Sequence, residues 1–359
     1  MTICSVWPLA VVCGVCALGD APSAAQATGV QAGSEGAMPL VEAIRLFTTI
    51  NVRMSPEQSA AAERAITSAE ATHGTEASWQ FARAMVLRRA GDGKAAREMM
   101  DRVVKAEPAV ADHQFWLGTL CFETINDAGL FEKMGQSNKG KAAFEKALQL
   151  DPAHVPARFA LFQFYANAPG IAGGSTAKAK ALAEELLALP EGKGEFNGHL
   201  CLAQLAAKEE SWDEMARQYA LAEALPPAGE GTGPLVAIRG HARTLLSIKK
   251  DPAAALVQVE RGVPLADSTE AQLWFIKGQA HQQLKQMDAA AEAFVKAVDV
   301  NPASAPSSLF GLAECLEATG KFKDAAERYA QFAKLFPKDE RAGQAGDGVK
   351  RCEKKVPSR

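Results

Sequence analysis

The sequence predicts an all-α protein built from a stack of antiparallel helix hairpins. Ala, Leu, Glu, Lys and Gln dominate long stretches of the 359 residues, and 48% of the chain is hydrophobic, which gives packed helices ample material for a core. Prolines also recur at spacings of 35 to 44 residues, a period typical of repeat arrays. They are Pro108, Pro152, Pro190, Pro227, Pro264, Pro302 and Pro337.

The charge balance narrows the class of partner. The 39 basic residues are offset by 42 acidic ones, so the chain has no basic excess with which to neutralise phosphates. We therefore expect a protein or peptide partner and no nucleic acid.

The first residues of the sequence resemble a secretory signal peptide. An apolar run from Ile3 to Leu18 is followed by small residues that end in Ala25-Gln26-Ala27. No Lys or Arg occurs before Arg45, so the positive segment is reduced to the amino terminus. A membrane anchor is disfavoured because the run is short of the ~20 apolar residues that a bilayer requires. We expect a signal peptide over 1–27 and an exported protein, periplasmic or secreted, without a membrane span in the mature chain.

The rest of the chain divides into a cap, repeats and a second cap. Residues 28–37 form a predicted flexible linker, and 38–74 an atypical capping hairpin whose second helix begins at Ser55-Pro56-Glu57-Gln58, a capping-box sequence. Asp251-Pro252 predicts another helix start. Repeats are expected over 75–227, with two inserted loops, and over 235–337, with a glycine-containing hinge between these blocks. A capping helix and tail follow over 338–359.

Two adjacent units carry the most regular motif. The first places seven residues at the gaps of the pattern W-x2-L-G-x2-Y-x8-A-x3-F-x2-A-x4-P: Trp274, Gly278, His281, Ala290, Phe294, Ala297 and Pro302. The second repeats these gaps with Leu309, Leu312, Ala313, Leu316, Ala325, Tyr329, Phe332 and Pro337. This pattern resembles the tetratricopeptide-repeat family, in an exported bacterial type with an inserted PGIAGGS loop. The resemblance implies a right-handed superhelical solenoid of antiparallel hairpins.

The motif has a physical basis in packing. Small residues such as Gly278 and Ala313 on the first helix of a hairpin allow close approach of the second helix, where Ala290 and Ala325 stand. Large residues such as Phe294 are expected to fill the seams between neighbouring hairpins. Four isolated cysteines are expected to be free buried thiols, not disulfides: Cys121, Cys201, Cys315 and Cys352.

The candidate binding surface follows from the predicted stack. The first helices of successive hairpins should line a concave groove in which side chains select an extended peptide or a helical segment. We expect this groove to include Asn197, Leu200, Gln204, Gln272, Phe275, Gln279, Gln282, Gln283, Ser307, Phe310, Glu314 and Glu317. The expected function is a non-catalytic interaction scaffold.

The alternative function is a small-ligand or enzyme-accessory site. It would use a pocket formed by the inserted loops at 126–139 and 168–176, where an anion could meet Gly170, Gly173, Gly174 and Ser175. A glycine turn with a serine cap accounts for the second loop equally well. The stretch 135–142 spells G-x-x-x-x-G-K but lacks the hydroxyl residue and the preceding strand of a phosphate loop. No residue pattern indicates catalysis, a metal or a cofactor.

Overall fold

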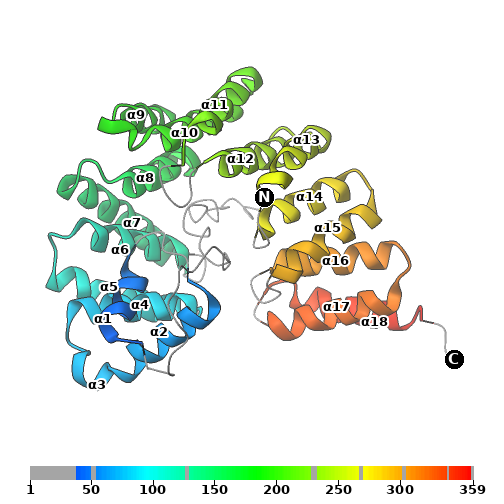
Figure 1. Cartoon of the computed structure of the whole chain (residues 1–359), viewed down its shortest axis with the longest axis horizontal. Helices are drawn as coiled ribbons and strands as arrows, with labels where there is room; N and C mark the ends of the chain where they lie inside the picture. Colours follow the sequence, from blue (N-terminus) through cyan, green and yellow to red (C-terminus); the bar gives the residue numbers. More distant parts are fainter. Residues whose placement is uncertain are drawn as a thin grey trace, which may run out of the picture. The chain divides into compact units, whose positions relative to one another are not determined.

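The computed structural model describes residues 38–49, 54–125, 129–227, 233–266, 270–300, 305–337 and 339–356. In these ranges the regular secondary structure is helical, with eighteen α-helices and no strand (Figure 1). The predicted all-α fold is confirmed. The predicted signal peptide and linker lie outside the described residues. None of the helices described is both long and apolar enough to cross a bilayer.

The chain forms two compact units, and the boundary between Leu205 and Ala206 lies inside a helix. The helices of unit 1 are α1 (Leu40–Thr48), α2 (Pro56–Ser68), α3 (Glu70–His73), α4 (Ala77–Arg89), α5 (Gly93–Ala106), α6 (Ala111–Glu123), α7 (Leu130–Leu150), α8 (Val155–Asn167), α9 (Thr176–Leu187) and most of α10 (Glu195–Lys208). Those of unit 2 are α11 (Trp212–Ala224), α12 (Pro234–Ser247), α13 (Pro252–Gly262), α14 (Ala271–Gln283), α15 (Met287–Val300), α16 (Pro306–Ala318), α17 (Phe322–Leu335) and α18 (Ala342–Glu353).

Unit 1 is a succession of hairpins. Helix α4 pairs with α5, α6 with α7 and α8 with α9, and the second helix of each of the first two contacts the first helix of the next hairpin. At the start, α1 and α2 contact each other and both contact α4. The indole nitrogen of buried Trp79 donates to the carbonyl oxygen of Ile66 at 2.9 Å, which fastens α4 to α2. Buried Phe144, Phe162 and Phe164 continue the core.

The predicted helix starts are confirmed at two places. The Ser55 hydroxyl accepts from the Gln58 amide, while the Gln58 side chain accepts from the Ser55 amide, so the capping box at the start of α2 is complete. The Asp251 carboxylate accepts from the Ala254 amide at 3.0 Å and Pro252 opens α13. These bonds satisfy amides that the first turn of a helix leaves without an intrahelical partner.

The first inserted segment differs from the prediction. We expected a loop over 126–139, but α7 already begins at Leu130 and is 21 residues long. A Cβ atom on Gly140 would lie 2.7 Å from the Phe122 ring, so glycine at this position allows α7 to pack closely on α6. The G-x-x-x-x-G-K stretch therefore lies inside a helix and is not a phosphate loop.

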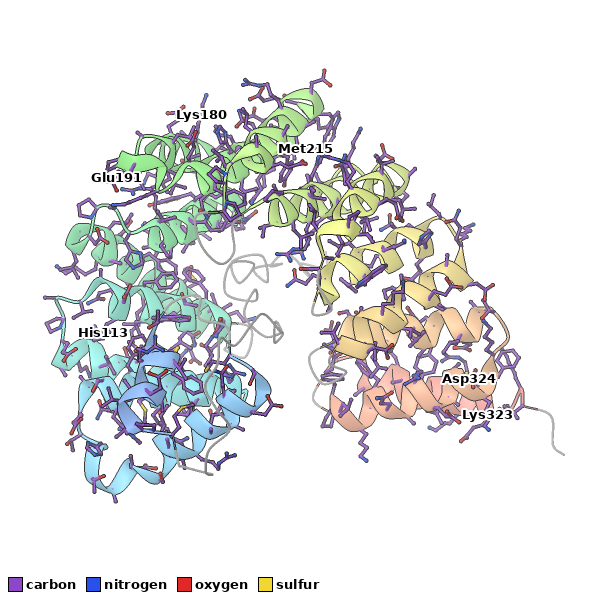
Figure 2. All side chains as sticks on the ribbon, viewed as in Figure 1. His113, Lys180, Glu191, Met215, Lys323 and Asp324 are labelled. Carbon is purple, nitrogen blue, oxygen red and sulfur yellow. The ribbon has the colours of Figure 1, made fainter. Side chains whose placement is uncertain are left out.

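Unit 2 repeats the hairpin arrangement. Helix α12 pairs with α13, α14 with α15 and α16 with α17, while α18 packs against α17. Phe294 of α15 is 1% exposed, and a Cβ atom on Gly278 or Gly311 would lie 2.5 or 2.9 Å from its ring. Met215 of α11, labelled among the side chains of Figure 2, is buried as well.

The four cysteines of the described chain are free and buried, as predicted. Burial raises the pKa of the Cys121 and Cys315 thiols to about 11. It raises the pKa of Cys201 and Cys352 as well, so all four remain protonated near neutral pH.

Candidate functional site

The first helices of the unit 2 hairpins lie next to one another. Helix α12 contacts α14, and α14 contacts α16 (Figure 1). Nine of the predicted groove residues stand on two of these helices: Gln272, Phe275, Gln279, Gln282 and Gln283 on α14, and Ser307, Phe310, Glu314 and Glu317 on α16. We call α12, α14 and α16 with these side chains the first-helix surface of unit 2.

Polar side chains interlock across this surface. The Arg243 guanidinium on α12 donates to the Gln272 side-chain oxygen at 3.0 Å. On the next pair of helices, the Gln282 amide donates to the Glu314 carboxylate at 3.2 Å. Gln279 is half-buried, and Gln283 at the end of α14 is exposed. The surface therefore carries amide groups that can both donate and accept hydrogen bonds.

The two aromatic side chains of the predicted groove have different environments. Phe275 is half-buried, with its ring centroid 6.1 Å from that of Phe294. Phe310 is 8% exposed and packs against Tyr329 and Phe332, with the Arg341 guanidinium 5.4 Å from its ring centroid. Phe310 thus belongs to the core of the last hairpin.

The remaining predicted residues of α16 also contact the C-terminal part of the chain. The Arg341 guanidinium donates to the Ser307 hydroxyl at 3.3 Å. The Glu317 carboxylate accepts from the Arg351 guanidinium and from the Tyr329 hydroxyl, and these bonds lower its pKa, the first more strongly. Glu317 therefore holds α18 against α16 and α17.

A buried ion pair positions α14 on α12. The Arg239 guanidinium lies 2.9 Å from the Glu270 carboxylate, and both side chains are about nine-tenths buried. A Glu270 oxygen also accepts from the Leu273 amide at 3.1 Å, which caps the start of α14. The pair therefore fixes the register of two helices that bear the surface.

The sequence analysis did not include Arg243 among the groove residues, although its position in the repeat gives a signal for it. Arg243 follows the small residue Ala242, as Gln279 follows Gly278 on α14. Residues 235–264 match the repeat pattern poorly, so the pattern alone does not align these positions. The structure places Arg243 and Gln272 in contact, which makes α12 part of the surface.

In unit 1, the predicted groove residues Asn197, Leu200 and Gln204 lie half-buried on α10. The Gln163 amide donates to the Gln204 side-chain oxygen at 3.0 Å, and the Asn167 amide donates to the Gln163 side-chain oxygen at 3.0 Å. A chain of side-chain amides thus joins α8 to α10. Gln163 is only 1% exposed, so it braces the two helices and is not open to a partner.

The second inserted segment is a tightly bonded turn. The amides of Ala172 and Gly174 donate to the Pro169 carbonyl, at 2.8 and 3.0 Å, and the Gly173 amide donates to the Gly170 carbonyl at 3.0 Å. The Ser175 amide donates to the Tyr165 carbonyl at 2.8 Å, and its hydroxyl caps α9. These four amides already donate to carbonyl oxygens of the chain, so the loop offers few hydrogen-bond donors to an anion. A glycine turn followed by a serine helix cap explains the residues of this loop.

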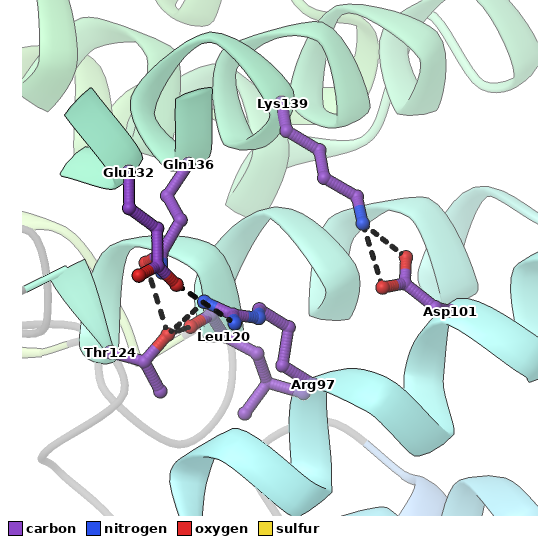
Figure 3. Close-up of polar contacts among 7 residues, drawn as sticks. All are labelled: Arg97, Asp101, Leu120, Thr124, Glu132, Gln136 and Lys139. Atoms are coloured by element: carbon purple, nitrogen blue, oxygen red, sulfur yellow. Dashed lines mark hydrogen bonds and ion pairs between the residues drawn. The ribbon is translucent and has the colours of Figure 1, made fainter. Parts of the chain in front are cut away.

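The first inserted segment braces α7 against α5 (Figure 3). The Arg97 guanidinium of α5 lies 3.6 Å from the Glu132 carboxylate of α7, and the Lys139 ammonium lies 2.7 Å from the Asp101 carboxylate. The Gln136 amide donates to Glu132 at 2.9 Å. A cleft of about 260 Å³ lies between the two helices, and these bonds cross or border it. The segment therefore has a structural role.

No group of three or more His, Cys, Asp or Glu side chains in the described ranges is arranged to hold a metal ion. His154 contacts Asp112 at 2.9 Å, and its other ring nitrogen accepts from the Ala157 amide, so it caps α8.

Comparison with known families identifies the repeat. Residues 81–129 and 275–340 match one family model described as tetratricopeptide repeat, and residues 128–154 match a second with the same description. The chain therefore matches tetratricopeptide repeats over these stretches. The matched stretches contain most of the hairpins α4 to α7 and α14 to α17. A comparison with curated protein sequences finds no match.

Solved structures are similar to the chain at low identity. Yeast Tom70 has a TM-score of 0.66 and 16% identity, over 96% of this chain and 69% of that chain. A tetratricopeptide repeat protein from Parabacteroides merdae ATCC 43184 has a TM-score of 0.48 and 16% identity, over 67% of this chain and 86% of that one. The APC/C hetero-tetramer Cut9-Hcn1 has a TM-score of 0.43 and 13% identity, over 87% of this chain and 62% of that one. The likeness to Tom70 shows the tetratricopeptide-repeat fold.

Proposed function

We propose that this tetratricopeptide-repeat protein is a non-catalytic scaffold that binds an extended peptide or a helical segment along the first-helix surface of unit 2. The fold is generally a protein–protein interaction scaffold without catalysis. The observation that carries the finer proposal is the row of side-chain amides on α14, which runs from Gln272 to Gln283 and borders half-buried Phe275.

The chemistry of this row suits a peptide. An extended backbone presents both N–H and C=O groups, and a glutamine side chain can donate to one and accept from the other. Phe275 adds apolar area that a partner side chain can cover. Arg243 and Glu314 stand at the two ends of the row and hold Gln272 and Gln282 in place. Such prior ordering lowers the entropic cost of binding.

The proposal is tested by cross-linking and affinity capture from the native host with wild type and a Gln279→Arg variant. We expect wild type to capture a defined protein and the variant to lose it, because a bulkier charged side chain in the middle of the row displaces the partner. Gln344→Arg, at an exposed position of α18, is the matched control and should capture as wild type does. Circular dichroism checks that both variants remain folded. Unchanged capture by Gln279→Arg would contradict the proposal.

A further inference from the structure

Unit 2 has a second candidate surface on its second helices. A cleft of about 310 Å³ lies between α15 and α17. Its apolar part is formed by Ala291 and Val295 of α15 and by Leu312 and Leu316 of α16. Val295 is 38% exposed although its neighbours Phe294 and Val298 are buried. The volume is near the low end of the about 300–1,000 Å³ of ligand pockets, enough for one or two side chains.

The rim of this cleft is acidic. Four carboxylates line it against two basic groups: Asp288, Glu292, Asp324, Glu327, Lys321 and Arg328. The Lys321 ammonium bonds to Asp288 at 2.9 Å, which accounts for one of the carboxylates. Glu292, Glu327 and Asp324, the last labelled in Figure 2, make no hydrogen bond or salt bridge to another described residue.

Nearby basic side chains do not neutralise the negative charge of this rim. The Lys296 ammonium lies 4.1 Å from the centre of the Trp274 ring and does not line the cleft. The hydrogen bond to Asp288 raises the pKa of Lys321, and the charges of Asp324 and Glu292 raise it further. Two negative charges therefore remain around an apolar floor.

We propose that this cleft binds a short protein segment in which one or two aliphatic side chains are flanked by lysine or arginine. The aliphatic side chains would contact Val295 and Leu316, and the cations would pair with Glu292, Asp324 and Glu327. Charge complementarity favours such a segment over an acidic one, and the exposed Val295 beside half-buried Leu316 favours it over a purely polar one. Both surfaces use α16, but the lining of the cleft includes none of the predicted groove residues, so the chain would hold two partners or two parts of one.

The test measures binding of labelled model peptides to the full chain by fluorescence anisotropy. The first probe is an amphipathic peptide of leucine and lysine, the second replaces lysine by glutamate, and the third replaces leucine by serine. We expect the leucine–lysine peptide to bind at least about tenfold more tightly than the other two. It alone has both aliphatic side chains to contact the apolar floor and cations to pair with the acidic rim. Equal binding of the serine–lysine peptide would overturn the proposal, since it would show general charge attraction.

Variants locate the binding. Glu292→Lys/Asp324→Lys and, separately, Val295→Ser should each weaken the leucine–lysine peptide by about tenfold, as the rim and floor are altered at exposed positions. Glu209→Lys/Glu353→Lys makes the same change of charge at exposed positions outside the helices that line the cleft and should bind as wild type. Equal loss in this control, or no loss in the rim variant, would overturn the proposal.

Two further measurements test whether the peptide occupies a different surface or the cleft holds a second copy of the chain. Gln279→Arg should bind the leucine–lysine peptide as wild type does, and a loss there would place the peptide on the first-helix surface and overturn the proposal. A dimer in analytical ultracentrifugation that Val295→Ser abolishes would show a second copy in the cleft, which would also overturn it.

Discussion

Phe294 fills the seam between two neighbouring hairpins of unit 2. Its ring is in contact range of Gly278 on its own hairpin and Gly311 on the next. Truncation to alanine leaves a cavity that these glycines cannot fill, so Phe294→Ala should lower the free energy of unfolding by about 3 to 5 kcal/mol. Urea denaturation measures this. Val257→Ala, at a position 60% exposed, should cost less than about 0.5 kcal/mol. Similar losses in the two variants would contradict the packing described.

His241 makes the stability of unit 2 depend on pH. Its ring stacks on Tyr219 at 4.9 Å, and burial, followed by the charges of Arg261 and Lys249, lowers its pKa from 6.5 to about 4. Between these two values the unfolded chain binds a proton that the folded chain does not, so the stability from this residue is present above pH 6.5 and is lost as the pH falls toward 4.

The corresponding measurement is thermal unfolding at pH 7.5 and pH 5 for wild type and His241→Gln. We expect the melting temperature of wild type to fall more between the two pH values than that of the variant, which has no ring to protonate. An equal fall in both proteins would mean that other groups set the pH dependence.

At the scale of helices, the Arg239–Glu270 pair joins α12 to α14. Removal of one partner leaves a buried unpaired charge, so Glu270→Ala should cost about 3 to 5 kcal/mol and also remove the cap of α14. Replacement of both residues, as Arg239→Met/Glu270→Leu, should recover much of this loss. A double-mutant cycle in urea gives the coupling. An additive double variant would show that the pair does not act as a unit.

Helix positions were predictable where a local chemical rule fixes them. Ser55 and Asp251 accept from amides three residues on, and these short patterns are visible in the sequence. The start of α7 was not predictable from the sequence. Gly140 looks like a helix breaker there, and its role in close packing depends on Phe122, which belongs to another helix. A glycine that breaks a helix and one that permits close packing look the same until the neighbour is known.

The candidate surface was only partly predictable for a similar reason. The repeat pattern placed Gln272, Gln279 and Gln282 on a first helix. It could not show that Arg341 also covers Phe310, since this arginine comes after the last repeat. Nor could it show the cleft between α15 and α17, which three helices form together.

At the scale of the whole molecule, we propose that the chain is exported. The apolar run from Ile3 to Leu18 and the small residues up to Ala27 motivate this. N-terminal sequencing of the protein purified from its host should give a mature chain that begins at Thr28. An intact Met1 end would contradict export by cleavage.

The buried cysteines give the molecule a set of internal reporters. Cys121 lies on α6, Cys201 on α10, Cys315 on α16 and Cys352 on α18, and all four are shielded and protonated. A thiol reagent can modify a shielded cysteine only when its own hairpin opens, and in a repeat array each hairpin depends mainly on its neighbours. The four modification rates, resolved by peptide mass, would therefore map how opening is distributed along the stack, without an added label.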